Sequence, residues 1–92
     1  MATRETDDPP PSVTPNQLRA ARGLVRWSMQ DLSDKSGVPF DTISGFEVRD
    51  AQSKPETLAK LTKALRAAGV EFIYPDEKGG PGVRLKAGKG KR

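Results

Sequence analysis

Four stretches of this chain place apolar residues at the spacing that keeps them on one face of a helix. The four apolar sets are Leu18, Ala21 and Val25; Met29 and Leu32; Ile43 and Phe46; and Leu58, Leu61, Leu65 and Ala68. They predict helices over about residues 15–26, 29–36, 39–48 and 55–68. We expect the Leu, Val, Ile and Phe side chains of these sets to form the core, because large aliphatic and aromatic groups are the ones most often buried.

Caps and helix breakers mark the ends of the predicted helices. Thr14 can accept a hydrogen bond from the first turn of a helix that begins at Pro15. Ser28 and Asp31 have the spacing of a capping box, with Asp in place of the usual Glu, and a cap explains Asp31 better than catalysis does. A glycine or a proline marks the other ends, at Gly37, Pro39, Pro55 and Gly69. Residues 48–54 are polar and lack a period, which predicts a loop.

The two ends of the chain differ in composition from its middle. Residues 1–13 are acidic and proline-rich, which predicts a disordered arm, and residues 14–69 hold the helices. Residues 70–74 and 82–86 are short segments with branched or aromatic side chains, and the loop between them contains Pro and Gly. This pattern predicts a β-hairpin extension over residues 70–86. Residues 87–92 form a basic tail that we expect to be flexible.

Composition excludes several kinds of chemistry. The chain has 92 residues with no cysteine and no histidine, so disulfides, thiol nucleophiles, classical zinc sites and imidazole catalysis are excluded. We expect no cofactor, no metal and no enzymatic activity. No apolar run approaches the length of a membrane span, and the acidic start does not resemble a signal peptide, so we expect a cytoplasmic protein. The net charge of +4 suits a polyanion, although a solvated charged surface explains it equally well.

Two short helices joined by a glycine-bearing turn form the unit that presents its second helix to the major groove of DNA. Over residues 28–47 this segment resembles the Cro and phage-repressor (XRE) family of helix-turn-helix regulators. The matching positions are Arg22, Leu32, Gly37, Val38, Thr42, Ile43, Phe46, Glu47, Pro55, Thr57 and Leu58. The resemblance covers residues 14–69, and the C-terminal segment is similar to that of small bacterial members with an extension. It implies a mainly α, lambda-repressor-like domain of four or five helices with a short C-terminal β-hairpin.

The resemblance also implies an interface with double-stranded DNA. The expected phosphate contacts are Ser28, Met29 and Gln30 at the start of one helix and Arg49, Gln52 and Lys54 after the reading helix; the last three are otherwise a solvated loop. The reading helix is expected to present Pro39, Phe40, Asp41, Thr42, Ser44 and Gly45 to the groove. Arg22 and Glu47 are expected to form an ion pair between two helices.

This chain departs from the family pattern at several of these positions. Met29 stands where Gln is usual, and no Arg, Gln, Lys or Asn faces outward from the reading helix. The base contacts still open to this helix are an apolar contact of Phe40 with a thymine methyl, a hydrogen bond that Asp41 accepts from a cytosine amino group, and a hydroxyl contact from Ser44. Asp41 is equally explained by the dipole at a helix N-terminus, and Trp27 is better explained as a partly buried corner than as a stacking platform.

Two function classes stay open. The first is a transcriptional regulator that binds operator DNA as a homodimer, nucleoid-associated when bound, with residues 70–74 and 82–86 at or near the subunit interface. The second is a helix-turn-helix module acting through proteins, such as an antitoxin that binds a toxin, a phage accessory factor or an activator that binds RNA polymerase. Residues 72 and 73 need an apolar cover, which either the fourth helix or a second subunit supplies.

Overall fold

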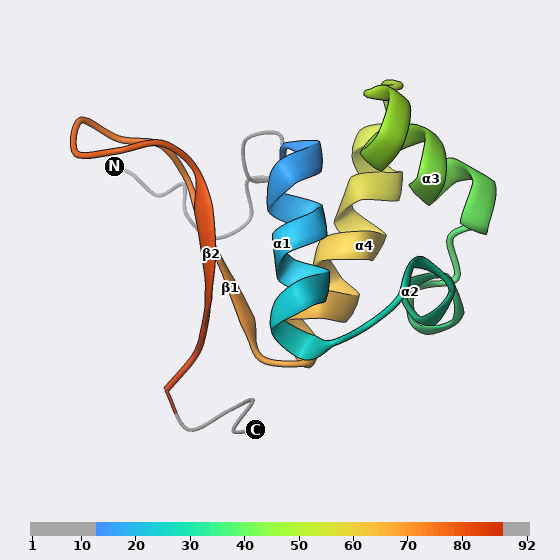
Figure 1. The fold of residues 1–92 in the computed structure, drawn as a ribbon, viewed down its shortest axis with the longest axis horizontal. Coiled ribbons are helices and arrows are strands. Elements are labelled where there is room, and N and C mark those ends of the chain that lie inside the picture. Colours follow the sequence, from blue (N-terminus) through green and yellow to red (C-terminus); the bar gives the residue numbers. More distant parts are fainter. Residues whose placement is uncertain (1–12, 88–92) are drawn as a thin grey trace.

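The computed structural model describes residues 13–87, in which four helices are followed by a two-stranded antiparallel sheet (Figure 1). The elements are α1 (Pro15–Val25), α2 (Met29–Ser36), α3 (Phe40–Arg49), α4 (Pro55–Ala67), β1 (Val70–Ile73) and β2 (Gly82–Leu85). This confirms the mainly α fold with a C-terminal hairpin. The predicted helix over about residues 39–48 extends one residue further: α3 continues through Arg49, and Asp50 ends it in a left-handed conformation with φ 55°.

Helix α1 begins where its cap predicts. The Thr14 hydroxyl accepts a hydrogen bond from the Gln17 amide, and the Gln17 side chain accepts one from the Thr14 amide, which completes a capping box. Val13, placed in the disordered arm by its composition, is instead buried in the core with Leu18. These two residues occupy the positions of a hydrophobic staple on either side of the cap. The rest of the predicted arm and residues 88–92 of the predicted tail lie outside the described residues.

One core joins all four helices to the sheet. Its fully buried large side chains are Leu18, Leu32, Ile43, Leu61, Thr62, Leu65 and Val70. Val25 and Leu58, also predicted to be core, are only partly buried against it. Burying each of these aliphatic side chains stabilises the fold by about 1.5–3 kcal/mol before conformational entropy is counted.

The hairpin packs on its own chain. Gly69 follows α4 with φ 106°, a left-handed conformation that glycine adopts without strain, and turns the chain into β1. Val70 pairs with Leu85 and Phe72 with Val83, and these four side chains belong to the core or pack against it. Phe72 is 8% exposed. The same chain therefore supplies the apolar cover of Phe72, whereas Ile73, also expected to need a cover, is half-buried and lies outside this core.

The Gln17 side chain connects α1 to the hairpin by hydrogen bonds. Its side-chain amide is buried and donates to the carbonyl oxygens of Ile73 at 3.0 Å and Gly82 at 3.1 Å, the paired residues at one end of the sheet. Along the longest axis of the molecule, 38 Å, the hairpin lies beside α1 at one end and α2 and α3 lie at the other (Figure 1). The hairpin is thus remote from the helix-turn-helix.

Candidate nucleic-acid interface

The corner between α2 and α3 is held by local hydrogen bonds. Gly37, with φ 80°, ends α2 and donates its amide to the Ser33 carbonyl at 2.9 Å. The Ser33 hydroxyl donates to the Val38 carbonyl at 2.6 Å, and the Val38 amide donates to the Ser36 hydroxyl at 3.1 Å. Val38 is buried, so the turn is anchored in the core and the angle between the two helices is fixed.

The start of α2 carries the predicted capping box. The Ser28 hydroxyl accepts from the Asp31 amide, and the Asp31 carboxylate accepts from the Ser28 amide, both at 2.9 Å. Met29 is half-buried against the core, whereas Gln30 is exposed and donates to Asp34 at 3.0 Å. The amides of Met29 and Gln30 stay at the open end of the helix, where an anion is favoured.

The side of α3 that faces away from the core is open to solvent. Phe40 is 39% exposed, Asp41 is exposed, and Thr42 and Ser44 are half-buried. Pro39 is exposed and serves as the N-cap residue without a side-chain hydrogen bond. Of the residues expected to face the groove, Pro39, Phe40 and Asp41 are thus exposed, whereas Thr42 and Ser44 are partly covered.

Val48 is an exposed residue on this side that sequence reasoning missed. It is 65% exposed, the most exposed large apolar side chain in the described part of the chain. Assigning residues 48–54 to a loop hid its relation to α3. Its spacing of four residues from Ser44 and seven from Asp41 would have revealed the shared helix face.

Gly45 differs from the expectation that it lies open to the groove. It is buried, because the Arg49 side chain and Ala51 cover the space where a side chain would begin. The Ala51 amide donates to the Gly45 carbonyl at 3.1 Å, which folds the chain after α3 back over the helix. Gly45 thus occupies the outward side of α3, as expected from the helical angle, but it is covered there by Arg49 and Ala51.

The predicted ion pair between α1 and α3 is present and largely buried. Arg22 donates to both carboxylate oxygens of Glu47, at 2.8 and 2.6 Å, and also to the Trp27 carbonyl at 2.9 Å. The side chains are 15% and 1% exposed, respectively. The hydrogen bond that Arg22 donates to Glu47 raises the pKa of Arg22 above its ordinary value, against the opposing effect of burial. Trp27 is the half-buried corner that was predicted, with the Lys35 ammonium 5.5 Å from its ring centroid.

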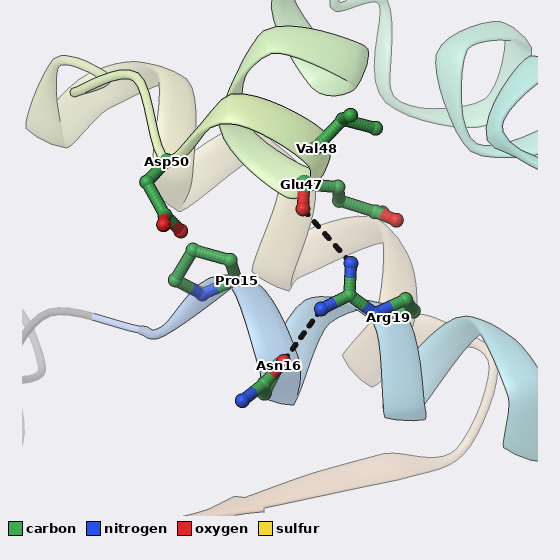
Figure 2. Close-up of a pocket in the computed structure, with 6 residues that line it drawn as sticks. All are labelled: Pro15, Asn16, Arg19, Glu47, Val48 and Asp50. Carbon is green, nitrogen blue, oxygen red and sulfur yellow. Dashed lines mark hydrogen bonds between the residues drawn. The ribbon is translucent and has the colours of Figure 1, made fainter.

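A second arginine of α1 supports the end of α3. Arg19 donates to the Glu47 carbonyl at 2.8 Å and to Asn16 at 2.5 Å, as Figure 2 shows. It lies in an open depression of about 380 Å³ lined by Pro15, Asn16, Arg19, Glu47, Val48 and Asp50. Because its guanidinium already bonds both helices, we interpret the depression as a helix–helix junction. No pattern in the sequence predicts this contact.

The loop after α3 carries the other predicted contacts. Arg49, Gln52 and Lys54 are all exposed, at the end of α3 and in the chain that leads to α4. Residues 28–54 as a whole hold five acidic residues against three basic ones. The helix-turn-helix is thus not itself a basic surface, and two of its three cations, Arg49 and Lys54, lie at the end of α3 and just before α4.

Other kinds of site find little support among residues 13–87. No group of three or more His, Cys, Asp or Glu residues in this range is arranged to hold a metal ion. No helix in the same range is long and apolar enough to cross a membrane.

Comparison with known proteins agrees with this geometry. A family model described as Helix-turn-helix, of the XRE/Cro type, matches residues 18–72, more than half of the chain. The match runs from α1 into β1 and includes the whole exposed side of α3. A search of curated proteins finds no match.

Proposed function

The chain belongs to the XRE/Cro-type helix-turn-helix family of DNA-binding proteins, and from this premise we propose that it is a sequence-specific transcriptional regulator that binds operator DNA as a homodimer. The observation that carries the proposal is the outward side of α3. On this side Phe40, Asp41 and Val48 are exposed, Ser44 is half-buried and Gly45 is covered, and the core side of the helix is fixed to α1. A rigid helix with a free outer side is what major-groove reading requires.

Phosphate contacts on both sides of α3 would set its position in the groove. The free amides of Met29 and Gln30 at the start of α2 favour an anion there, since they combine unpaired N–H groups with the positive end of the helix dipole. Gln52 and Lys54 follow α3 and are exposed, so they would contact the backbone beyond the other end of the reading helix.

We include the homodimer in the proposal because operators for such domains are often palindromic, and a palindromic site matches a protein dimer with two-fold symmetry. Helix-turn-helix dimers place two reading helices on half-sites separated by about one DNA turn or a multiple of it. The inner side of the hairpin is covered by its own chain, so a hairpin interface would be made by the strand edges or by the outer side that carries Glu71 and Arg84.

The proposal is tested by selecting a binding site from random duplexes and comparing it with unselected duplex over a salt titration. We expect the selected site to bind at least about 1,000-fold tighter than random duplex at physiological salt. Lys54→Ala should weaken both duplexes equally and lower the salt slope by about one unit. Lys63→Ala, an exposed charge change on α4, is the matched control and should leave the slope unchanged. A failure to enrich any sequence would contradict the proposal.

A second candidate function is favoured by the chemistry of the exposed side of α3. Phe40 and Val48 are apolar, Asp41 is acidic, and residues 28–54 hold more acids than bases. Such a surface suits a protein partner, such as a toxin or RNA polymerase, at least as well as a phosphate backbone. Loss of partner binding in Phe40→Ala together with an absence of DNA selectivity would identify this function.

A further inference from the structure

Gly45 lies at the centre of the outward side of α3. Asp41, Gly45 and Val48 follow one another at intervals of four and three residues, so they form one stripe along the helix. The two outer members are exposed, and the core residues Ile43 and Phe46 point the other way. A side chain at position 45 would therefore project outward from α3, on the side expected to face the groove. Glycine has no side chain, so this position is available to a neighbouring residue.

The Arg49 side chain fills this place. A Cβ atom built on Gly45 would lie 3.2 Å from Arg49 Nη2, 3.9 Å from Arg49 Cζ and 3.7 Å from Ala51 Cβ. The guanidinium thus lies back along the helix by one turn, in the direction in which long helical side chains lean. No hydrogen bond or salt bridge from this guanidinium to another described residue is present, and Arg49 is exposed.

We propose that Arg49 is the base-reading arginine of this protein, positioned on the groove side of α3 by Gly45, and that it recognises a guanine through its O6 and N7 atoms. This rests on the proposed function. A guanidinium offers two parallel N–H donors, which match the two acceptors that guanine presents in the major groove. Arg49, the last residue of α3, thus takes the role of the outward Arg or Gln that the earlier positions of the helix lack.

The position of Arg49 distinguishes it from the neighbouring phosphate contacts. Gln52 and Lys54 belong to the loop, beyond the C-terminal end of α3. The Arg49 guanidinium instead covers the middle of the helix, between the turns of Asp41 and Val48. The reading helix of such domains lies in the major groove and contacts base edges, whereas contacts with phosphate fix the orientation of the protein and carry no sequence information.

The test measures affinities for the selected site, for its single-base variants and for random duplex. Wild-type protein should prefer one guanine in each half-site by roughly 10-fold or more over the other bases. 7-Deazaguanine at that position removes the N7 acceptor and should lower the wild-type affinity several-fold. Arg49→Ala should abolish this preference, make the deaza substitution harmless and leave the preferences at other positions intact. Lys63→Ala is the charge-matched control.

Gly45→Ala tests the positioning itself. The new Cβ would meet the guanidinium at 3.2 Å, so this flexible end must shift by a few tenths of an ångström, while the contact with Ala51 is of ordinary length. Ala favours helix over Gly, so the melting temperature should not fall. We expect a reduced guanine preference with Arg49 still present.

Three results separate the inference from the proposed function. If Arg49→Ala weakens the site, its variants and random duplex equally and lowers the salt slope, Arg49 contacts phosphate and the inference is wrong while the regulator stands. If Gly45→Ala preserves the guanine preference in full, the positioning by Gly45 is wrong. If the wild-type protein prefers no duplex sequence, both the inference and the proposed function are overturned.

Discussion

The guanidinium of Arg22 holds both carboxylate oxygens of Glu47 and, with its remaining nitrogen, the Trp27 carbonyl. One side chain of α1 is thereby bonded to the end of α3 and to the residue that leads into α2. Arg19 adds a bond from α1 to the Glu47 main chain. The orientation of the reading helix therefore depends on two arginines of a helix that carries no proposed contact with DNA.

Replacement of Glu47 by Ala should strongly destabilise the protein. It leaves the largely buried Arg22 guanidinium without its counter-charge, which costs about 3–5 kcal/mol. Urea unfolding followed by circular dichroism measures this loss. The matched control is Glu71→Ala in the exposed pair with Arg84, where we expect little change. Equal unfolding midpoints for the two variants would show that the Arg22–Glu47 pair contributes no more than a surface pair.

Replacement of Gln17 by Ala should loosen the hairpin. It leaves the Ile73 and Gly82 carbonyls without this donor and the Thr14 amide without its acceptor, at a cost of about 1–3 kcal/mol. Hydrogen exchange should become faster for amides of β1 and β2 than for those of α2 and α3. Gln30→Ala removes an exposed amide of the same kind and should leave hairpin exchange unchanged. Uniform acceleration over the whole chain would argue against a local role.

Phe40 and Asp41 are expected to contribute to base preference. Phe40→Ala should weaken discrimination between thymine and uracil at one position, because uracil lacks the methyl group that an apolar ring contacts. Asp41→Asn should relax a cytosine preference at another. Affinities for single-base variants of the selected site provide the measurement. If Asp41→Asn changes only the melting temperature, the carboxylate serves the helix dipole alone.

The exposed pair on the hairpin predicts a dependence on pH. The hydrogen bond and the charge of Arg84 hold the pKa of Glu71 below its ordinary value. Since the folded-state pKa is the lower one, any stability from this pair is present above the unfolded-state pKa and is lost as pH falls through the folded-state pKa. NMR titration of the Glu71 carboxyl carbon should show the depressed pKa, and Arg84→Met should return it toward the ordinary value.

The location of the hairpin makes the dimer testable by operator spacing. The hairpin and α3 lie toward opposite ends of a 38 Å axis, so two copies joined at their hairpins would place their reading helices about two DNA turns apart. Selected sites should then contain half-sites separated by about 20 base pairs. Spacing of one turn would place the interface elsewhere, and a monomer at high micromolar concentration in light scattering would contradict the dimer.

The helices and their ends could be predicted from the sequence because the signals are local. The capping bonds of Thr14 and Ser28 join residues three apart, and the left-handed Gly37 depends only on its own backbone. Apolar spacing then fixed which side of each helix is buried. The Arg22–Glu47 ion pair could be predicted only from the family resemblance, because the two residues are 25 positions apart in the sequence.

Only the tertiary structure decided how distant segments cover one another. Val13 is buried because the staple brings it to the core, although its neighbours have the composition of a disordered arm. Gln17 bonds residues 56 and 65 positions away, which no periodicity records. The Arg49 side chain leans back along α3 and the chain after α3 brings Ala51 over the helix, so both cover Gly45 where the helical angle alone predicted an open surface. Local preferences set the elements, whereas loop paths and side-chain conformations set what remains exposed for recognition.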